Sequence, residues 1–466
     1  MDLSKFLKSE GLSRKQQYSL ILCLGAPAIL AQLASVAMQY IDAAMVGSLG
    51  AAASASIGVV MSSTWIAVGL IYACAMGFSV QVAHAVGAND FEQAQKVFRA
   101  GLIVCIAIAS VLSAVCIGLS QHLPAFLGAD QKIWHDSSSY FFIYACFVPA
   151  VQVRIFAGSV LQCAGNTKIP SILNSLLCLF DIIFNYFLIF PSCDMVIGNY
   201  SIILPRANLG VAGAALGTAL SEFIIAIIML FMACRMLKFH FDFSRFSFSK
   251  NILKTSYKIS APMAVESIAL NGAHVFLVSI VAPLGTVALA ADIFGFTMEQ
   301  ICYLPGFGIS IAATTLVGQA LGAKRPDLAR EFAWSAVRCG VTIVTSVAIA
   351  LYILAPTVFE FLTPDVAVQK LGTQALRIEL FSEPLFAAST VIVGALRGAK
   401  DTFVPSLITL GCKWGVLLPL SLLLVKNYGL VGVWFAICAD FCVRGILFLL
   451  RLRNEKSWMK IRENEQ

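Results

Sequence analysis

Long apolar runs separated by short polar connections follow one another along this chain of 466 residues. Residues 101–119 and 341–355 contain no charged side chain, and residues 216–232 contain only Glu222. A helix needs about 20 predominantly apolar residues to cross the hydrocarbon core of a bilayer. The pattern therefore predicts membrane-spanning helices and not a water-soluble core.

Glycines, prolines and charge clusters divide the apolar sequence into twelve predicted spans. Their limits are 18–48, 52–82, 97–120, 138–161, 170–191, 209–234, 255–283, 287–319, 332–355, 372–396, 404–425 and 429–452. The composition agrees, because 59% of the residues are hydrophobic and 12% are charged, whereas soluble domains carry about 25% charged residues. The sequence predicts an all-α polytopic membrane protein with twelve transmembrane helices.

The second half of the chain repeats the first. Five Pro or Gly residues recur 235 positions later: Pro27 and Pro262, Gly50 and Gly285, Gly87 and Gly322, Pro149 and Pro384, and Pro170 and Pro405. Both residue types constrain backbone geometry, so their equivalent positions indicate that the two halves have the same backbone shape. We therefore expect two pseudo-symmetric six-helix lobes, with an N-lobe at 1–234, a cytoplasmic linker at 235–258 and a C-lobe at 259–466.

The register changes late in the repeat. Gly210 and Gly213 correspond to Gly429 and Gly432 at a separation of 219 residues. The extra residues of the first copy lie at 193–208, which the span limits place in an external loop. We interpret this segment as an insertion in the first lobe only.

Positive charge gathers on one side of the predicted membrane. The connections and tails of that side contain Lys5, Lys8, Arg14, Lys15, Lys96, Arg99, Lys168, Arg235, Lys238, Arg245, Lys250, Lys254, Lys258, Lys324, Arg325, Arg330, Arg338, Arg397, Lys400, Arg451, Arg453, Lys456, Lys460 and Arg462. The opposite loops contain Lys132, Arg206, Lys370 and Lys426. The positive-inside rule then predicts that both termini lie in the cytoplasm. We expect the protein to lie in the cell (inner) membrane. The net charge of +7 reflects this orientation, and we expect no nucleic-acid partner.

Ionisable residues within predicted spans are candidates for function, because each is costly in a bilayer unless it faces a cavity or a partner. The first copy has Asp42, Asp181 and Glu222. Asp181 and Asn185 are four residues apart, so they share a helical face. The structural alternative is that these polar groups only hydrogen-bond to one another between helices.

The second copy has a larger acidic set, namely Glu266, Asp292, Glu299, Glu379 and Glu383. The corresponding residues of the first copy are Ala31, Ile57, Thr64, Tyr144 and Val148. Such carboxylates cannot all stay ionised at close range in a low dielectric, so we expect at least one to take up a proton. The alternative is a structural role, with carboxylates paired to Lys413 or Arg154. Asp440 and Arg444, four residues apart, are expected to form an internal salt bridge.

Other chemistries have no support in the sequence. The five histidines are scattered and form no zinc pattern, and no phosphate-binding glycine loop is present. We therefore expect no enzyme, no cofactor and no metal site beyond a Na⁺ ion at the N-lobe residues.

Four segments together resemble the multidrug and toxic compound extrusion (MATE) family, in its bacterial type. They are residues 42–47 (DAAMVG), 86–88 (VGA), 316–323 (LVGQALGA) and 395–402 (ALRGAKDT). The resemblance implies a twelve-helix antiporter with a central cavity between two lobes. It further implies secondary active efflux of organic compounds in exchange for H⁺ or Na⁺.

The resemblance also carries over to single residues. Asp42 matches a membrane-embedded aspartate of the family, Thr218 matches a family position, and Glu266 and Glu299 match acidic positions of many members. Asp292 occupies a position that is often His in relatives. One branch of the family has Asn followed four residues later by Asp, whereas this chain has the reverse order at 181 and 185. Carboxylate, amide and hydroxyl oxygens at these positions suit a hard cation or a titrating network.

Taken together, the sequence predicts an ion-coupled exporter in which the lobes alternate access to a central cavity. Asp42, Asp181, Asn185 and Thr218 are the candidate cation-coupling residues of the N-lobe, and the five C-lobe acids are candidates for coupling or substrate binding. We expect small, lipophilic, cationic organic substrates, contact with membrane lipid and a monomer. A lipid-linked oligosaccharide flippase of the wider superfamily is an alternative, which would need a strongly cationic cavity. A channel or receptor is the other alternative, and steady currents without exchange would identify it.

Overall fold

The computed structural model describes residues 12–197, 200–204, 206–238 and 249–459. Residues 239–248 of the predicted linker 235–258 lie outside these ranges. The linker is shorter than predicted, because α8 continues to Met236 and α9 already begins at Lys250. Both helices extend beyond their apolar runs, as helices can when their polar end residues reach water.

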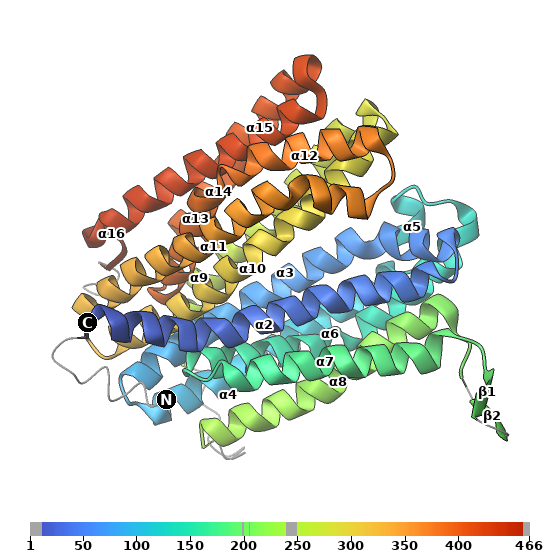
Figure 1. Ribbon diagram of the computed structural model, residues 1–466. Coiled ribbons are helices and arrows are strands. Elements are labelled where there is room, and N and C mark those ends of the chain that lie inside the picture. Colours follow the sequence, from blue (N-terminus) through green and yellow to red (C-terminus); the bar gives the residue numbers. More distant parts are fainter. Residues whose placement is uncertain (1–11, 198–199, 205, 239–248, 460–466) are drawn as a thin grey trace.

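Helices account for nearly all of the described chain (Figure 1). The N-lobe consists of α2 (Arg14–Gly47), α3 (Ala51–Gly87), α4 (Phe91–Leu119), α5 (Leu123–Phe126), η1 (Gln131–Ile133), α6 (Trp134–Cys163), α7 (Lys168–Ile189) and α8 (Gly210–Met236). The C-lobe consists of α9 (Lys250–Val281), η3 (Ala282–Leu284), α10 (Thr286–Gly322), α11 (Pro326–Leu362), α12 (Val366–Leu380), α13 (Glu383–Gly398), α14 (Phe403–Cys412), η4 (Lys413–Leu417), α15 (Leu418–Arg453) and α16 (Glu455–Met459).

The helices confirm the predicted fold class. Among the described residues, 10 helices are long and apolar enough to span a membrane, or 11 when the bent pair α12 and α13 counts as one span. The last of them, Phe403–Arg453, has 51 residues, which corresponds to roughly 75 Å and exceeds any bilayer. It is interrupted at Gly429, whose φ of 56° and ψ of −136° are not helical. Glycine tolerates this geometry, and the chain reverses there, so the run supplies the two predicted spans 404–425 and 429–452.

The predicted span 372–396 is not a straight helix. It is bent by 54° between α12 and α13, at Phe381 and Ser382. Pro384 stands at the start of α13 and cannot donate the backbone hydrogen bond that would continue the helix. Its counterpart Pro149 lies inside the continuous helix α6. Prolines at equivalent positions therefore stand at a bend in the C-lobe but inside a continuous helix in the N-lobe.

The insertion in the first lobe forms a two-stranded antiparallel hairpin. Its strands are β1 (Cys193–Ile197) and β2 (Tyr200–Leu204), and Cys193 pairs with Leu204. In Figure 1 the hairpin projects away from the helices at one end of the N-lobe. It lies between α7 and α8, where the sequence register changes.

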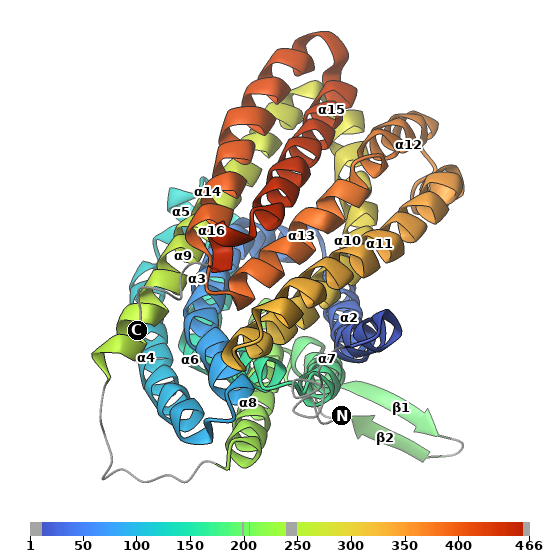
Figure 2. The same ribbon diagram turned by 90° about the vertical axis from the view of Figure 1, so that its left-hand side faces the viewer.

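The two lobes meet at one end of the bundle and diverge toward the other (Figures 1 and 2). We call these the closed end, which contains Arg14, Gly87 and Gly322, and the open end, which contains Gly47 and Gly429. Hydrogen bonds between the lobes lie in the closed half, and they involve side chains of α2, α3, α10 and α11. At the crossing of α3 and α10, a Cβ added to Gly87 would overlap the backbone of Gln319, and one added to Gly322 would overlap His84.

The contacts at this crossing obey the same 235-residue register as the sequence. The His84 ring nitrogen Nε2 lies 2.8 Å from the Gly398 carbonyl, and Gln319 Nε2 donates to the Cys163 carbonyl at 2.8 Å. Gln319 is the counterpart of His84, and Gly398 is the counterpart of Cys163. The interface therefore consists of two pseudo-equivalent hydrogen bonds around two close-packed glycines.

The first helix of each lobe reaches into the other lobe. Leu20 and Leu24 of α2 belong to a buried core with Ile309 and Leu316 of α10. In the same way, Ile252 of α9 belongs to the core that contains Phe78 and Phe156 of the N-lobe. Beyond Pro27 and Pro262 each helix also contacts its own lobe, through Asp42 in α2 and Glu266 in α9. Met263 and Ser267 of α9 nevertheless still lie against α3 of the N-lobe.

Substitution of Gly87 tests the glycine crossing. We expect Gly87→Ala to lower the free energy of unfolding by about 1–3 kcal/mol, because its Cβ would push against backbone that cannot rotate away. Gly58→Ala is the matched control, since Gly58 lies in the same helix and an added Cβ there meets no atom within 4 Å. Melting temperatures of the two detergent-solubilised variants check this, and equal values would contradict it.

Candidate functional site

An amide joins two carboxyl groups in the open half of the N-lobe. Asn185 Nδ2 of α7 donates to Asp42 Oδ1 of α2 at 2.9 Å and to Asp181 Oδ2 at 3.0 Å. Asp181 and Asn185 are fully buried, and Asp42 is partly buried. The spacing of four residues on α7 therefore places both polar groups on one face, turned toward α2.

Further oxygen atoms surround these three residues. Thr218 of α8 lies next to the Asp181 carboxyl group, and Tyr140 of α6 adjoins both acids. Asp181 Oδ1 and Asn185 Oδ1 are buried and have no hydrogen-bond partner among the described residues. The four N-lobe residues singled out in the sequence thus come together, and two acceptor oxygens among them remain available to a cation.

Gly217 is a residue of this site that sequence reasoning missed. An added Cβ on Gly217 would overlap Asn185 Oδ1 and approach Asn185 Cγ at 3.1 Å. Only glycine lets α8 approach the amide so closely. Its place directly before Thr218 was the signal that could have identified it.

In the C-lobe, three glutamates of different helices adjoin one another. Glu299 of α10 lies beside Glu379 of α12, and Glu379 lies beside Glu383 of α13. All three are buried, and the carboxyl oxygens of Glu379 and Glu383 accept no hydrogen bond from the described residues. The last two adjoin although the helix is bent between them, so their contact comes from the bend and not from a shared helical face.

Two basic residues partly balance this cluster. Lys413 Nζ lies 3.0 Å from Asp440 Oδ2, and Arg444 Nη2 lies 3.5 Å from the same atom. The ion pair expected between Asp440 and Arg444 is therefore present, with Lys413 added to it. Lys413 also lies near Glu299 and Glu379. Four acids thus face two cations, which leaves an excess of carboxyl groups to be neutralised by protons or cations.

The remaining two C-lobe candidates have their own partners. Ser406 donates to Glu266 Oε2 at 2.6 Å, which joins α9 to α14. Trp434 Nε1 donates to Asp292 Oδ1 at 2.9 Å, and Asp292 lies near Glu299 at the border of the cluster. Glu266 has no contact with the glutamate cluster among the described residues.

A buried ion pair of the N-lobe joins two charges whose pairing the sequence left open. Arg154 of α6 donates from Nε to Glu222 of α8, and from Nη1 to Asn174 Oδ1 of α7 at 3.2 Å. Their side chains are 18% and 10% exposed. Opposite charges in two apolar spans were a signal for this pair, which makes Glu222 a structural partner and not a free acid.

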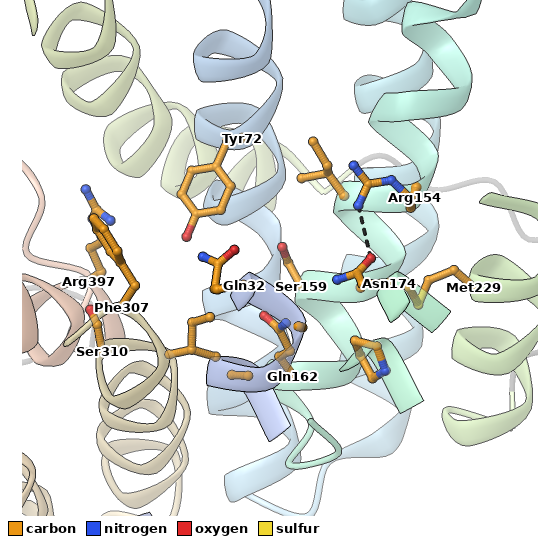
Figure 3. A pocket seen from close by; sticks show the side chains of 16 residues that line it. Gln32, Tyr72, Arg154, Ser159, Gln162, Asn174, Met229, Phe307, Ser310 and Arg397 are labelled. Atoms are coloured by element: carbon orange, nitrogen blue, oxygen red, sulfur yellow. Dashed lines mark hydrogen bonds between the residues drawn. The ribbon is translucent and has the colours of Figure 1, made fainter. Parts of the chain in front are cut away.

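The arginine faces a cavity between the lobes, with a volume of about 290 Å³ (Figure 3). Its polar lining comes from both lobes and includes Gln32 and Tyr72 of the N-lobe and Arg397 of the C-lobe. Metal coordination is not indicated elsewhere, since the described residues contain no group of three or more His, Cys, Asp or Glu residues that could hold a metal ion.

Comparison with known proteins shows one consistent family. The MatE family model matches residues 27–187 and 262–423, one match for each repeat. A probable multidrug resistance protein NorM of Thermotoga maritima is 24% identical over 450 residues, which cover 94% of this chain and 93% of that protein. The uncharacterized transporter YisQ of Bacillus subtilis is 23% identical, with 83% of each chain covered.

Solved structures share the fold. A mutant of the Vibrio cholerae MATE transporter VcmN superposes with a TM-score of 0.88 at 18% identity and covers 95% of this chain and 98% of that one. A multidrug resistance MATE family transporter in an outward-facing conformation also gives a TM-score of 0.88 at 18% identity, with 99% of both chains covered.

The Arg154 and Glu222 pair can be tested as a unit. We expect Arg154→Met or Glu222→Met alone to cost roughly 3 kcal/mol of stability, because each leaves one charge without its partner. The double variant should recover at least half of this loss, since neither charge remains. Melting temperatures of the three variants measure the coupling, and strictly additive losses would contradict the pairing.

Proposed function

The chain belongs to the MatE family, and we propose that it is a secondary transporter that expels organic compounds from the cell in exchange for an entering cation. Two of its relatives, a probable multidrug resistance protein and an uncharacterized transporter, support this class. The observation that carries the proposal is the pair of carboxyl groups, Asp42 and Asp181, held around one amide in a partly open site. We infer no cofactor and no enzymatic activity.

We place the closed end in the cytoplasm. The helix ends there carry the basic residues of the sequence, for example Lys96, Lys168 and Arg235, and the positive-inside rule orients such ends inward. Both termini are then cytoplasmic in an inner-membrane protein. With this orientation the open end faces outward, so the arrangement described above corresponds to an outward-facing state.

The N-lobe carboxyl groups are the proposed coupling site. Two carboxyl groups, the unpartnered Oδ1 of Asn185 and the hydroxyl oxygen of Thr218 suit H⁺, which one carboxylate would take up, or Na⁺, which prefers several oxygen ligands. A cation that binds there cancels charge that would otherwise repel or retain a substrate. One elementary charge crossing 100 mV supplies about 2.3 kcal/mol, which is enough to drive concentrative efflux.

Helix α2 offers a route from that site to the closed end. Its open half carries Asp42, while its closed half binds the C-lobe through Gln17, which bonds to Glu331 at 2.7 Å and Ser335 at 2.6 Å. Pro27 lies between the two halves and leaves one backbone acceptor of the helix unpaired. A shift of Asp42 on cation binding would therefore reach the interface that holds the lobes together.

The C-lobe cluster gives a second acidic region, and we assign it to attraction of lipophilic cations. The flippase alternative is less favoured, because the cavity between the lobes contains only two arginines, one of which is paired with Glu222, and is not strongly cationic. Membrane lipid surrounds the exposed apolar faces, and we expect the protein to act as a monomer.

A transport assay in inverted vesicles tests the coupling site. We expect uptake of a fluorescent organic cation to respond to an imposed pH gradient or an imposed Na⁺ gradient, and Asp42→Asn to reduce this response at least tenfold. Glu266→Gln should retain most of it, since Glu266 bonds to Ser406 outside the N-lobe site.

Asp365→Asn is the control for exchanging a carboxylate for an amide, because Asp365 caps α12 and Asn caps helices equally well. Full coupled efflux in both the Asp42 and the Glu266 variants would reject the assignment. Loss in Glu266→Gln alone would move the coupling site to the C-lobe.

Gly217→Ala tests the amide bridge without removing any charged group. The added Cβ should displace the Asn185 side chain from between Asp42 and Asp181. We expect coupled efflux to fall at least tenfold, while the protein remains folded and membrane-inserted. Gly118→Ala serves as the control, since no atom lies within 4 Å of an added Cβ there. Unchanged efflux in Gly217→Ala would show that the amide position is irrelevant to coupling.

A further inference from the structure

The cavity between the lobes differs in charge from the two acidic regions. Its lining residues come from α2, α3, α6, α7, α8, α10 and α13, and they include two arginines but no aspartate or glutamate. Figure 3 shows Arg397 on one side of the cavity and Arg154 on the opposite side, with Gln32 between them. The cavity is therefore a place where positive charge from both lobes converges.

The two arginines are not equivalent. Arg154 is balanced by Glu222 and is held by Asn174. Arg397 is partly buried, and no ion pair or hydrogen bond of its guanidinium group occurs among the described residues. A partly buried cation without a partner is unfavourable. The wall of the cavity therefore carries one uncompensated positive charge.

Several neutral donors of the same wall are also unused. The side chains of Gln32, Tyr72, Ser159 and Gln162 form no hydrogen bond with other described residues, and all four line the cavity. In Figure 3 the Tyr72 hydroxyl group and the Gln32 amide point toward each other across the cavity. Ser159 is buried, Gln32 and Gln162 are partly buried, and Tyr72 is 37% exposed, so these groups can bind a ligand in the cavity. Together with Arg397 they provide several hydrogen-bond donors, which suit an acceptor with negative charge.

We propose that this cavity binds a carboxylate group of the transported compound, with Arg397 as its ion-pair partner and the unused amide and hydroxyl groups as additional donors. The inference rests on the proposed function and adds organic zwitterions and anions to the cations that the acidic regions attract. A volume of about 290 Å³ accommodates a benzoate-sized group. A guanidinium group matches a carboxylate with two parallel hydrogen bonds.

The position of the cavity gives this binding a consequence for transport. Arg397 belongs to the C-lobe helix α13, while Gln32, Tyr72 and Ser159 belong to the N-lobe. Any movement that separates the lobes at the closed end must separate these groups from one another. A carboxylate between them therefore favours one arrangement of the lobes, and its affinity differs between the inward-facing and outward-facing states.

A matched pair of dyes tests the proposal on the purified full-length protein. Rhodamine 110 carries a free carboxylate, and rhodamine 123 is its methyl ester, so the two differ only in that group. Fluorescence anisotropy in phosphatidylcholine nanodiscs gives the dissociation constant of each. We expect Arg397→Gln to weaken rhodamine 110 binding about tenfold or more, as for loss of a charged hydrogen bond, and to leave rhodamine 123 unchanged.

Three controls accompany this measurement. Arg397→Lys keeps the charge and should retain part of the preference for the acid. Arg338→Gln removes an exposed arginine of α11 and should change neither dye. Unchanged rhodamine 123 binding also shows that Arg397→Gln is folded. An equal effect on both dyes, or none on the acid, overturns the proposal.

Two further arms separate the remaining explanations. Phosphatidylglycerol added to the nanodiscs should not compete with rhodamine 110, and competition that disappears in Arg397→Gln would assign the site to a lipid headgroup and overturn the proposal. Efflux of both dyes in inverted vesicles tests the proposed function separately. Wild-type protein that binds the acid through Arg397 but expels neither dye would retain the binding site and reject the transport function.

Discussion

The close approach of α3 and α10 at Gly87 and Gly322 is the constraint on which the rest of the structure depends. There the backbone of one lobe occupies the space of a missing Cβ on the other, and the hydrogen bonds of His84 and Gln319 lie beside it. Because the lobes touch in the closed half and diverge in the other, this crossing sets the boundary between the two sides of the membrane. An interface of small residues and few hydrogen bonds is also one that can separate without exposing a large apolar core.

The duplicated scaffold supports different chemistry in its two halves. In the N-lobe, one amide holds Asp42 and Asp181 apart at a site with free oxygens, whereas the C-lobe gathers three glutamates around a bend and adds Lys413. The two sites are on different helices of the repeat, since Asp42, Asp181 and Thr218 belong to α2, α7 and α8, and the three glutamates belong to α10, α12 and α13. Divergence therefore concerns both the side chains that the shared backbone presents and the helices that carry them.

Sequence patterns predicted the helices and their duplication well, because apolar length and the register of Pro and Gly are local properties. They also predicted that Asp181 and Asn185 share a face, which depends only on helical spacing. The bend at Pro384 was not predictable, because Pro149 at the same register leaves α6 continuous. The pairing of Lys413 with Asp440 depends on how α14 and α15 pack, and Gly217 matters only because a particular amide lies opposite it. The Arg397 cavity is formed by seven helices of both lobes, so no segment of sequence contains it.

The two kinds of site lie at different depths and on different lobes, and this separation bears on exchange. Asp42 is in the open half of the N-lobe, while Arg397 is in the closed half on a C-lobe helix. If the closed end opens, the groups around Arg397 part and the carboxylate they hold loses its donors, whereas the cation site within the N-lobe can remain intact. A compound with both charges would then be held most tightly when the lobes are closed around Arg397. Because binding favours whichever arrangement it fits best, the cation at Asp42 and the carboxylate at Arg397 need not compete for one position to be exchanged. It suffices that they favour different arrangements of the same two lobes, which the glycine crossing permits.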